Sequence, residues 1–267
     1  MENISDCAWR YLPLTTNDGP TNMAVDEAIL SARAKDLVPN TIRLYQWSPS
    51  TVSIGQHQSV SLEVEVDEIE RRGFQLVRRI SGGGAVLHAS GREITYAVIA
   101  QKQDLLSMLP ANLHNVDGIY KIILDIIQAT VAKLSVATEP GVVHCPALFI
   151  DGRKFSGNAQ CVRGNTVLQH GTILLSVDPD EMYSVLRPPS GITKGHMVRS
   201  VIAKVAGLEE HLGKEIDVHD FESKFTESAG ELLGTVLEPG ALAQQELDAI
   251  TTLQEKYVSD AWRYKYP

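Results

Sequence analysis

The stretch from Lys154 to Leu174 most constrains the fold, because turn signals stand on both sides of its first half. Asp151-Gly152 lies between apolar runs and is typical of the tight turn of a β-hairpin. Arg163-Gly164-Asn165 is predicted to form the next turn, before a long strand over residues 166–177. The pattern therefore predicts consecutive antiparallel strands, with Lys154 near the start of a returning strand and not on a mobile loop.

Small side chains follow this lysine. Ser156, Gly157 and Ala159 would let a ligand approach the backbone closely. Lys154 and His170 would then place a cation and an imidazole on adjacent strands over a floor of small residues, which suits an anionic ligand with an apolar tail. The alternatives are a solvated surface lysine and a histidine that only forms hydrogen bonds within the sheet.

Composition narrows the class of protein. The chain has 267 residues, of which 43% are hydrophobic and 21% charged, enough for one large domain or two small ones and against chain-wide disorder. A net charge of −9 argues against a broad nucleic-acid-binding surface. Without an apolar run that could span a bilayer, or a signal peptide, we expect a cytoplasmic protein without a membrane partner. The three cysteines lack metal-ligand spacing, so no metal site is predicted.

Periodicity and turn signals predict both kinds of secondary structure. Helices are predicted over residues 21–35, 66–72, 115–134, 179–187, 217–233 and 243–257, and further strands over 42–47, 51–55, 74–80, 85–88 and 93–100. Residues 190–199 are polar and punctuated by glycine, which predicts a mobile loop. Because the strands come in hairpins more than in βαβ units, the predicted class is α+β, with mixed, largely antiparallel sheets flanked by helices.

A run of three glycines, Gly82-Gly83-Gly84, joins two of the predicted strands. Such a run is costly to order, so a plain turn explains it poorly, and its exposed N–H groups would form an anion-binding concavity. Arg78 and Arg79 precede it, and His88 follows. Since adjacent strand residues face opposite sides, only one of the two arginines should point into the site. The spacing matches neither a P-loop nor a Rossmann fingerprint.

Cys145 has two interpretations, a buried apolar residue or a reactive thiol. In an extended segment its neighbour His144 would point to the opposite face, which disfavours a direct Cys-His pair.

Taken together, five segments resemble the lipoate–protein ligase A / octanoyltransferase family, which has the biotin- and lipoate-attaching fold. They are Asn22–Ala28, Arg78–His88, Gly152–Gln160, Leu168–Leu174 and Lys256–Trp262, in family order over nearly the whole chain. The resemblance implies one class II synthetase-like catalytic domain over residues 1–267, without the accessory domain of longer ligases. A ligase of this kind could rely on a separate accessory-domain chain.

The resemblance also implies an activity. In the ligases, lipoate and ATP, with Mg²⁺, give lipoyl-AMP, and a lysine of a lipoyl carrier domain then displaces AMP. The carrier is a 2-oxo-acid dehydrogenase subunit or a glycine-cleavage H protein. The lysine matching Lys154 is implied to be catalytic, because it holds the acyl carbonyl and the adenylate phosphate. The implied substrate- and nucleotide-binding residues are Arg78, Arg79, Ser81, Gly82, Gly83, Gly84, Ala85, His88, Gly157, Ala159, His170, Gly171 and Thr172.

Departures from the family pattern leave alternatives open. Ala89 stands where many members have Asp, and Pro146-Ala147 where ligases often have Asn-Asp. Cysteine-dependent transferases of the family carry their nucleophile in the same general loop as Cys145, at a different distance from the lysine. The triple glycine is more ligase-like, and we expect a lipoate–protein ligase. One alternative is an octanoyl or lipoyl transferase that uses a Cys145 thioester without ATP. Another is a non-catalytic lipoyl-carrier-binding protein, which the retained Lys154 and His170 disfavour.

Overall fold

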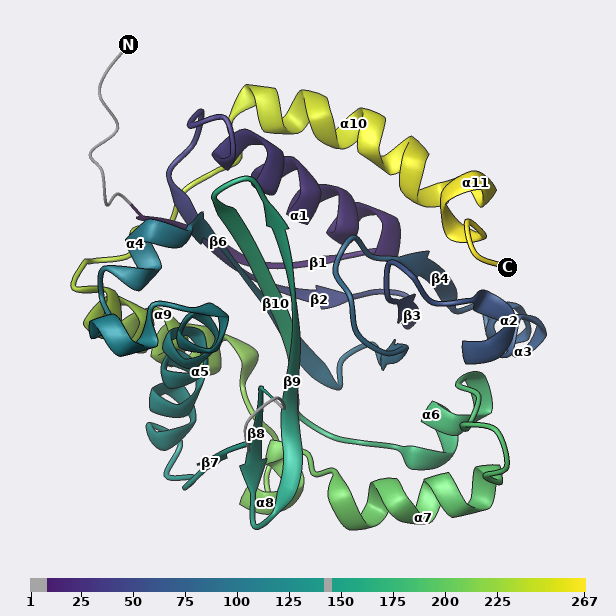
Figure 1. Ribbon diagram of the computed structural model, residues 1–267. Coiled ribbons are helices and arrows are strands. Elements are labelled where there is room, and N and C mark those ends of the chain that lie inside the picture. The colour runs from purple at the N-terminus through teal and green to yellow at the C-terminus, as the bar shows by residue number, and fades with distance from the viewer. Residues whose placement is uncertain (1–8, 142–145) are drawn as a thin grey trace.

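The structure is a computed structural model, and it describes residues 9–141 and 146–267. Its largest element is a seven-stranded sheet in the order β1-β2-β6-β10-β9-β8-β7 (Figure 1). The strands are β1 (Trp9–Asn17), β2 (Asn40–Trp47), β6 (Glu93–Gln101), β10 (Thr166–Leu174), β9 (Arg153–Arg163), β8 (Ala147–Ile150) and β7 (Glu139–Pro140). Strands β1 and β2 are parallel, and the other neighbours pair antiparallel.

A second sheet has three strands in the order β4-β3-β5. They are β3 (Thr51–Ile54), β4 (Gln75–Arg78) and β5 (Val86–His88), with β3 parallel to β4 and antiparallel to β5. Together with the first sheet and the helices, it confirms the α+β class with mixed, largely antiparallel sheets.

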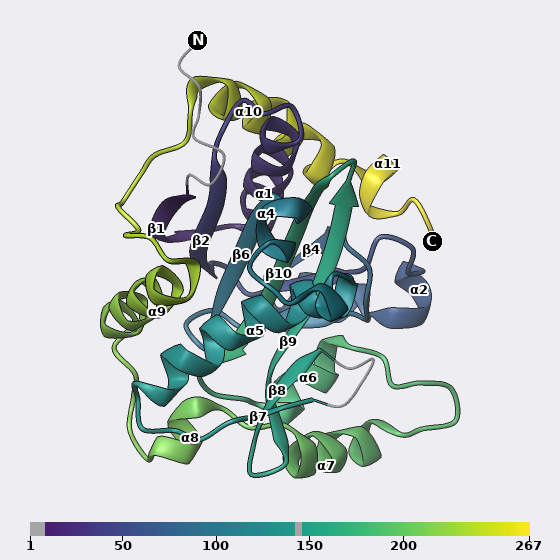
Figure 2. The same ribbon diagram turned by 60° about the vertical axis from the view of Figure 1, so that its left-hand side comes forward.

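Helices cover both faces of the large sheet (Figures 1 and 2). Helices α1 (Gly19–Arg33) and α10 (Gln244–Val258) pack on one face, and α5 (Val116–Ala132) and α9 (Val218–Leu233) on the other. The shorter helices are α2 (Val60–Glu63), α3 (Val66–Arg71), α4 (Lys102–Leu106), η1 (Ala111–Leu113), α6 (Pro179–Val185), α7 (Lys194–Lys204), α8 (Leu208–Leu212) and α11 (Asp260–Arg263). In the described parts of the chain, no helix is long and apolar enough to cross a membrane.

The predicted hairpin around Asp151-Gly152 is confirmed. Asp151 and Gly152 both have positive φ, +49° and +71°, as a primed hairpin turn requires. Lys154 is the second residue of β9, as predicted. The following strand stops at Leu174, shorter than the predicted 166–177.

The predicted mobile loop at residues 190–199 is wrong over residues 194–199, which form the start of helix α7, whereas residues 190–193 are a turn and an irregular segment. The Thr193 side chain accepts a hydrogen bond from the His196 amide and caps helix α7, and Val201 is buried beneath this helix. The glycines and polar residues hid the helix because only a narrow apolar stripe faces the protein.

Candidate active site

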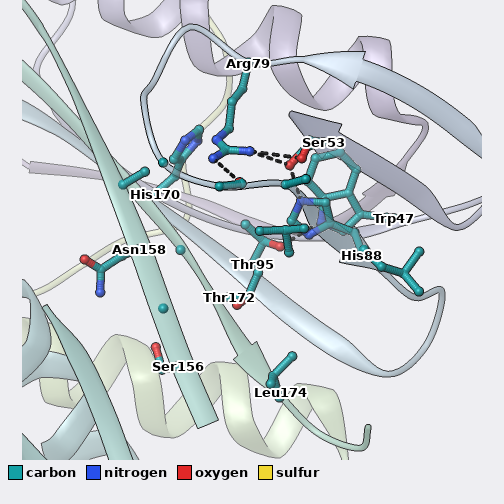
Figure 3. A pocket seen from close by; sticks show the side chains of 18 of the residues that line it. Trp47, Ser53, Arg79, His88, Thr95, Ser156, Asn158, His170, Thr172 and Leu174 are labelled. Carbon is teal, nitrogen blue, oxygen red and sulfur yellow. Dashed lines mark hydrogen bonds between the residues drawn. The ribbon is translucent and has the colours of Figure 1, made fainter. Parts of the chain in front are cut away.

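A cavity of about 370 Å³ opens between the two sheets. Strands β9 and β10 form one wall, and strands β3 and β5 with the glycine loop form the other (Figure 3). The predicted site residues that line it are Arg79, Gly83, Gly84, Ala85, His88, Lys154, Gly157, Ala159, His170, Gly171 and Thr172. Arg78, Ser81 and Gly82 are absent from its lining. Residues from three separate segments therefore meet at one place.

A β-bulge directs Lys154 into this cavity. Leu148 pairs with Ser156 and Phe149 pairs with Lys154, so Phe155 is an extra residue on β9. Without it, Lys154 and Gly157 would face opposite sides of the sheet; with it, they share the cavity side. A Cβ built on Gly157 would lie 2.8 Å from Cε and 2.9 Å from Nζ of the lysine. The lysine side chain therefore lies directly over the space that glycine leaves open.

The Lys154 ammonium has no counter-ion in the described parts of the chain. It forms neither a salt bridge nor a side-chain hydrogen bond with another described residue. Its backbone is fixed instead, because its carbonyl accepts a hydrogen bond of 3.0 Å from the amide of Ala206. The Lys154 backbone is held in place, and no described residue compensates its charge. The ammonium is therefore available to a ligand.

Arg79 lines the cavity, yet all the nitrogens of its guanidinium are engaged. Nη1 donates to the carbonyl and hydroxyl oxygens of Ser53, at 3.1 and 3.0 Å. Nη2 donates to the carbonyls of Gly82 and Gly84, at 2.8 and 2.7 Å, and Nε to that of Gly82. Burial lowers the pKa of Arg79 to about 10, so it stays charged at neutral pH. This arginine holds the glycine loop in shape and has no donor to spare.

Arg78 points away from the cavity, as strand alternation requires. It donates to backbone carbonyls, including those of Gln58 at 2.6 Å, Arg263 at 2.8 Å and Tyr266 at 3.1 Å. It therefore ties the chain's last segment to the small sheet, and its expected place in substrate binding has no geometric support. The expectation that only one of the two arginines faces the site is confirmed.

The glycine loop borders the cavity through Gly83 and Gly84, and its amides have no acceptor among the described residues. Gly83 has a φ of +91°, which favours glycine. The carbonyls of Gly82 and Gly84 accept from Arg79. The N–H groups of Gly82, Gly83 and Gly84 donate to no acceptor within the described residues. A loop whose carbonyls are held by an arginine and whose amides have no acceptor is typical of an anion-binding concavity.

Two histidines border the cavity, and each connects a serine to a buried carboxylate. His170 Nε2 lies 2.6 Å from Ser81 Oγ, and its Nδ1 lies 2.9 Å from Asp26 Oδ2. Asp26, on helix α1, also accepts from Arg43 at 2.8 Å and from Tyr45 at 3.0 Å. Burial alone would raise the pKa of Asp26, but Arg43 and His170 outweigh it and lower the pKa.

His88 forms the second relay. Its Nδ1 lies 2.7 Å from Glu93 Oε1, and its Nε2 lies 2.9 Å from Ser53 Oγ. A carboxylate only accepts, so Nδ1–H is directed to Glu93, and the other ring nitrogen of a neutral imidazole, Nε2, then accepts from the Ser53 hydroxyl. The imidazole also stacks on Trp47 with ring centroids 4.1 Å apart. Both relays end on the glycine loop, through Ser81 or through Arg79.

Sequence reasoning missed the residues behind these contacts. Asp26, Arg43 and Ser53 were not predicted as site residues, although each is almost fully buried. A signal existed for Asp26, which lies in an acidic pair inside an otherwise apolar helix and within a family segment. Arg43 and Ser53 lie on short strands and carry no local pattern. Within residues 9–141 and 146–267 there is no group of three acidic, histidine or cysteine side chains that could hold a metal. Cys145 lies outside the described residues.

Known proteins share the sequence pattern of this chain. The lipoyl protein ligase A/B catalytic domain family matches residues 18–230. The octanoyltransferase LipM of Kyrpidia tusciae is 32% identical, with 96% of this chain and 98% of the relative covered. LipM of Bacillus subtilis is 31% identical over the same shares.

Solved structures show the same fold at lower identity. A lipoate-protein ligase A bound with ATP has a TM-score of 0.82 at 20% identity, covering 97% of this chain and 99% of the other. A putative lipoate protein ligase from T. acidophilum with bound lipoic acid has a TM-score of 0.78 at 20% identity, covering 96% and 98%. The family match and the LipM relatives together confirm the resemblance found in the sequence, and the chain belongs to the lipoyl protein ligase A/B catalytic domain family of enzymes.

Proposed function

We propose that this chain is an acyltransferase that moves an octanoyl group from a thioester donor to the ε-amine of a lysine on a lipoyl carrier domain. The relatives named octanoyltransferase LipM, which match nearly end to end, support transfer. A solved archaeal ligase described together with its E2 lipoyl domain supports a carrier domain as the acceptor.

The observation that carries the proposal is the placement of Lys154. Its ammonium lies over Gly157 in a largely apolar cavity, without a counter-ion among the residues described. When a thiolate or an amine attacks the carbonyl carbon of a thioester, negative charge develops on the carbonyl oxygen. A fixed cation at that point stabilises the transition state more than the ground state. The remaining cavity can take the acyl chain.

Cys145 is the proposed nucleophile. It stands two residues before Ala147, and Ala147 pairs with Gly157, over which Lys154 lies. The Cys145 thiolate would attack the donor thioester and release the donor thiolate. The neutral ε-amine of the carrier lysine would then attack the Cys145 thioester, release the thiolate and lose a proton. The acyl group is thus conserved, and no ATP is consumed.

The test is a comparison of two assays on the same protein. One contains an octanoyl thioester donor and an acceptor lipoyl domain without ATP; the other contains lipoate, ATP, Mg²⁺ and the same acceptor. We expect modification in the first assay and an octanoyl group on Cys145 when the acceptor is omitted, seen by mass spectrometry. Cys145→Ser should lose almost all transfer, because an unactivated hydroxyl is a far poorer nucleophile than a thiolate. Cys161→Ser is the matched control. Full activity in Cys145→Ser would refute the thioester route.

ATP-dependent lipoate ligation is the second candidate, and the free amides of the glycine loop favour it because they suit a phosphate. Two features weigh against it. Arg79 has no N–H left for a polyphosphate, and among the residues described no Asp or Glu lines the cavity to help hold Mg²⁺. Acceptor modification that requires both lipoate and ATP would establish this candidate in place of the first.

A further inference from the structure

Helix α7, which the sequence did not predict, carries a basic outer face beside the cavity. We infer that this face docks the protein that delivers the acyl thioester, a small carrier domain with an acidic surface. The inference rests on the proposed transferase function and adds to it the place where the donor binds.

The first observation is charge. Residues 187–206 contain Arg187, Lys194, Arg199 and Lys204 and no Asp or Glu, in a chain whose net charge is −9. Arg187 and Lys194 face Glu65, at 3.1 and 3.4 Å. Arg199 and Lys204 are exposed, and neither forms an ion pair with any residue that the structure describes. A positive patch on an acidic protein steers an acidic partner to one place.

The second observation is an exposed apolar side chain beside Arg199. Ile202 is 57% exposed, while Val201 beside it is buried and holds the helix against the protein. Arg199 and Ile202 are three residues apart and therefore neighbours on the helix surface. Lys204, two residues after Ile202, lies on the other flank of Arg199. Exposed cations with an apolar side chain beside them are typical of a transient docking surface, in which charge favours the encounter and the apolar contact favours adhesion. We define the α7 face as Arg199, Ile202 and Lys204.

The third observation is the connection from this face to the catalytic lysine. Val205 follows the last residue of α7 and lines the cavity. Val205 forms a β-bridge with Lys154, and the next amide, that of Ala206, donates to the Lys154 carbonyl. Figure 1 shows α7 at the lower edge of the molecule, to the right of the lower end of β9. A domain bound on α7 would therefore hold a flexible acyl arm at the cavity that contains Lys154.

Charge complementarity selects this occupant. The donor must bring a thioester on an arm long enough to enter the cavity, and an acidic carrier domain satisfies both the arm and the charge. Rim charges act mainly on the association rate and its salt dependence. The face should consequently affect a carrier-bound donor and leave the same thioester without a protein unaffected.

The experiment measures the first half-reaction, octanoylation of the chain without an acceptor, by intact mass. The donors are octanoyl-pantetheine attached to an acyl carrier protein and free octanoyl-pantetheine. The variant is Arg199→Glu/Lys204→Glu. The control is Lys35→Glu/Lys214→Glu, which changes the net charge equally at exposed lysines outside α7 and the cavity lining. We expect the second-order rate constant with the carrier-bound donor to fall about tenfold or more at low salt, since steering raises on-rates about 10–10³-fold.

Four other results each overturn the inference in a distinct way. An equal loss with both donors would mean that α7 serves the cavity itself, and an equal loss in the control would mean that net charge alone matters. An unchanged rate with the carrier-bound donor would remove the α7 face from donor binding, with the transferase function intact. Absence of octanoylation from either donor in the unmodified chain would refute the transferase function, and the docking inference with it.

Discussion

The two walls of the cavity differ in how their charges are used. We call one side the anchored wall: the glycine loop with β3 and β5, together with His170 and Asp26, which are hydrogen-bonded to that loop through Ser81. Here Arg79, His88 and His170 direct their polar atoms to other protein groups. On the lysine wall, the Lys154 ammonium contacts no described carboxylate. Both walls carry cationic side chains, and from the sequence both were expected to bind the ligand. The difference supports the proposal that one wall is a scaffold and that the other carries the catalytic cation.

The cost of burial explains this division. A fully buried charge is unfavourable unless it is paired and hydrogen-bonded. Arg43 and Arg79 are 2% and 6% exposed, so their donors are satisfied within the fold, by Asp26 in one case and by Ser53 and loop carbonyls in the other. Lys154 is only half-buried and keeps part of its hydration, so its charge needs no internal partner and, under the proposed function, is available to the oxyanion of the reaction.

The largest effect is expected where the anchored wall is most buried. Asp26→Asn would leave Arg43 buried without its counter-charge and weaken the hydrogen bonds to Tyr45 and His170. Breaking a buried ion pair costs roughly 3–5 kcal/mol. We expect that loss in the free energy of unfolding, measured by urea denaturation. Asp125→Asn, which removes an exposed pair with Lys121, should cost about 0.3–0.5 kcal/mol.

The pH dependence of stability tests the same ion pair without a mutation. The pKa of Asp26 is lowered from its ordinary value of 3.8 in the folded chain. Its contribution to stability is therefore fully present above about pH 4 and is lost as the pH falls through the lower, folded-state value. Asp26→Asn should lack this part of the acid dependence. If the variant and the unmodified chain unfold with the same stability and the same acid profile, the anchored wall is no scaffold.

The lysine wall should respond in the opposite way. Lys154→Ala removes one charge-stabilising donor, which typically costs about 10²–10³ in rate, or roughly 2.7–4 kcal/mol of transition-state stabilisation. The melting temperature should scarcely change, since no described partner loses a contact. Steady-state acyl transfer and thermal unfolding of the same sample would separate the two effects. Lys214→Ala, at an exposed lysine, should change neither. A Lys154→Ala enzyme with a near-normal rate would make the lysine a solvated strand residue.

Much of the fold could be predicted from local pattern. The Asp151-Gly152 turn, the apolar stripe of helix α5 and the Asp178-Pro179 start of helix α6 each carry their cause in adjacent residues. Helix α7 could not be predicted in this way. Thr193 caps it, but its burial depends on tertiary contacts with α6 and β9, which leave no local pattern in the sequence.

The sequence predicted most of the residues that line the cavity, but it did not predict what their side chains contact. Alternation along β4 correctly placed one arginine on each side, yet nothing in the sequence indicates that both guanidinium groups donate mainly to backbone carbonyls. Those acceptors are distant in the chain and have no residue signature. The bulge at Phe155 was equally invisible, because β-strand periodicity alone would send Lys154 to the far side of the sheet from Gly157.

The smallest and most specific effect is expected for a substitution at Gly157, which the bulge at Phe155 places under the Lys154 side chain. A methyl group there would lie 2.8–2.9 Å from Cε and Nζ of Lys154, so the flexible end of the lysine must move. The φ angle of Gly157 is not in the left-handed region, and alanine in a strand interior is favoured over glycine by roughly 0.5–1 kcal/mol. Gly157→Ala should therefore keep or slightly raise the melting temperature while the rate of transfer falls about tenfold, near 1.4 kcal/mol.

A double-mutant cycle decides whether this loss passes through the lysine. If Gly157 acts only by leaving room for the ammonium, Gly157→Ala should have no further effect on transfer once Lys154 is already alanine. If the two losses instead add, the methyl group obstructs the acyl chain, and Gly157 belongs to substrate binding. If Gly157→Ala transfers at the normal rate, the ammonium tolerates displacement. In that case, the bulge shapes the strand without setting the position of the catalytic charge.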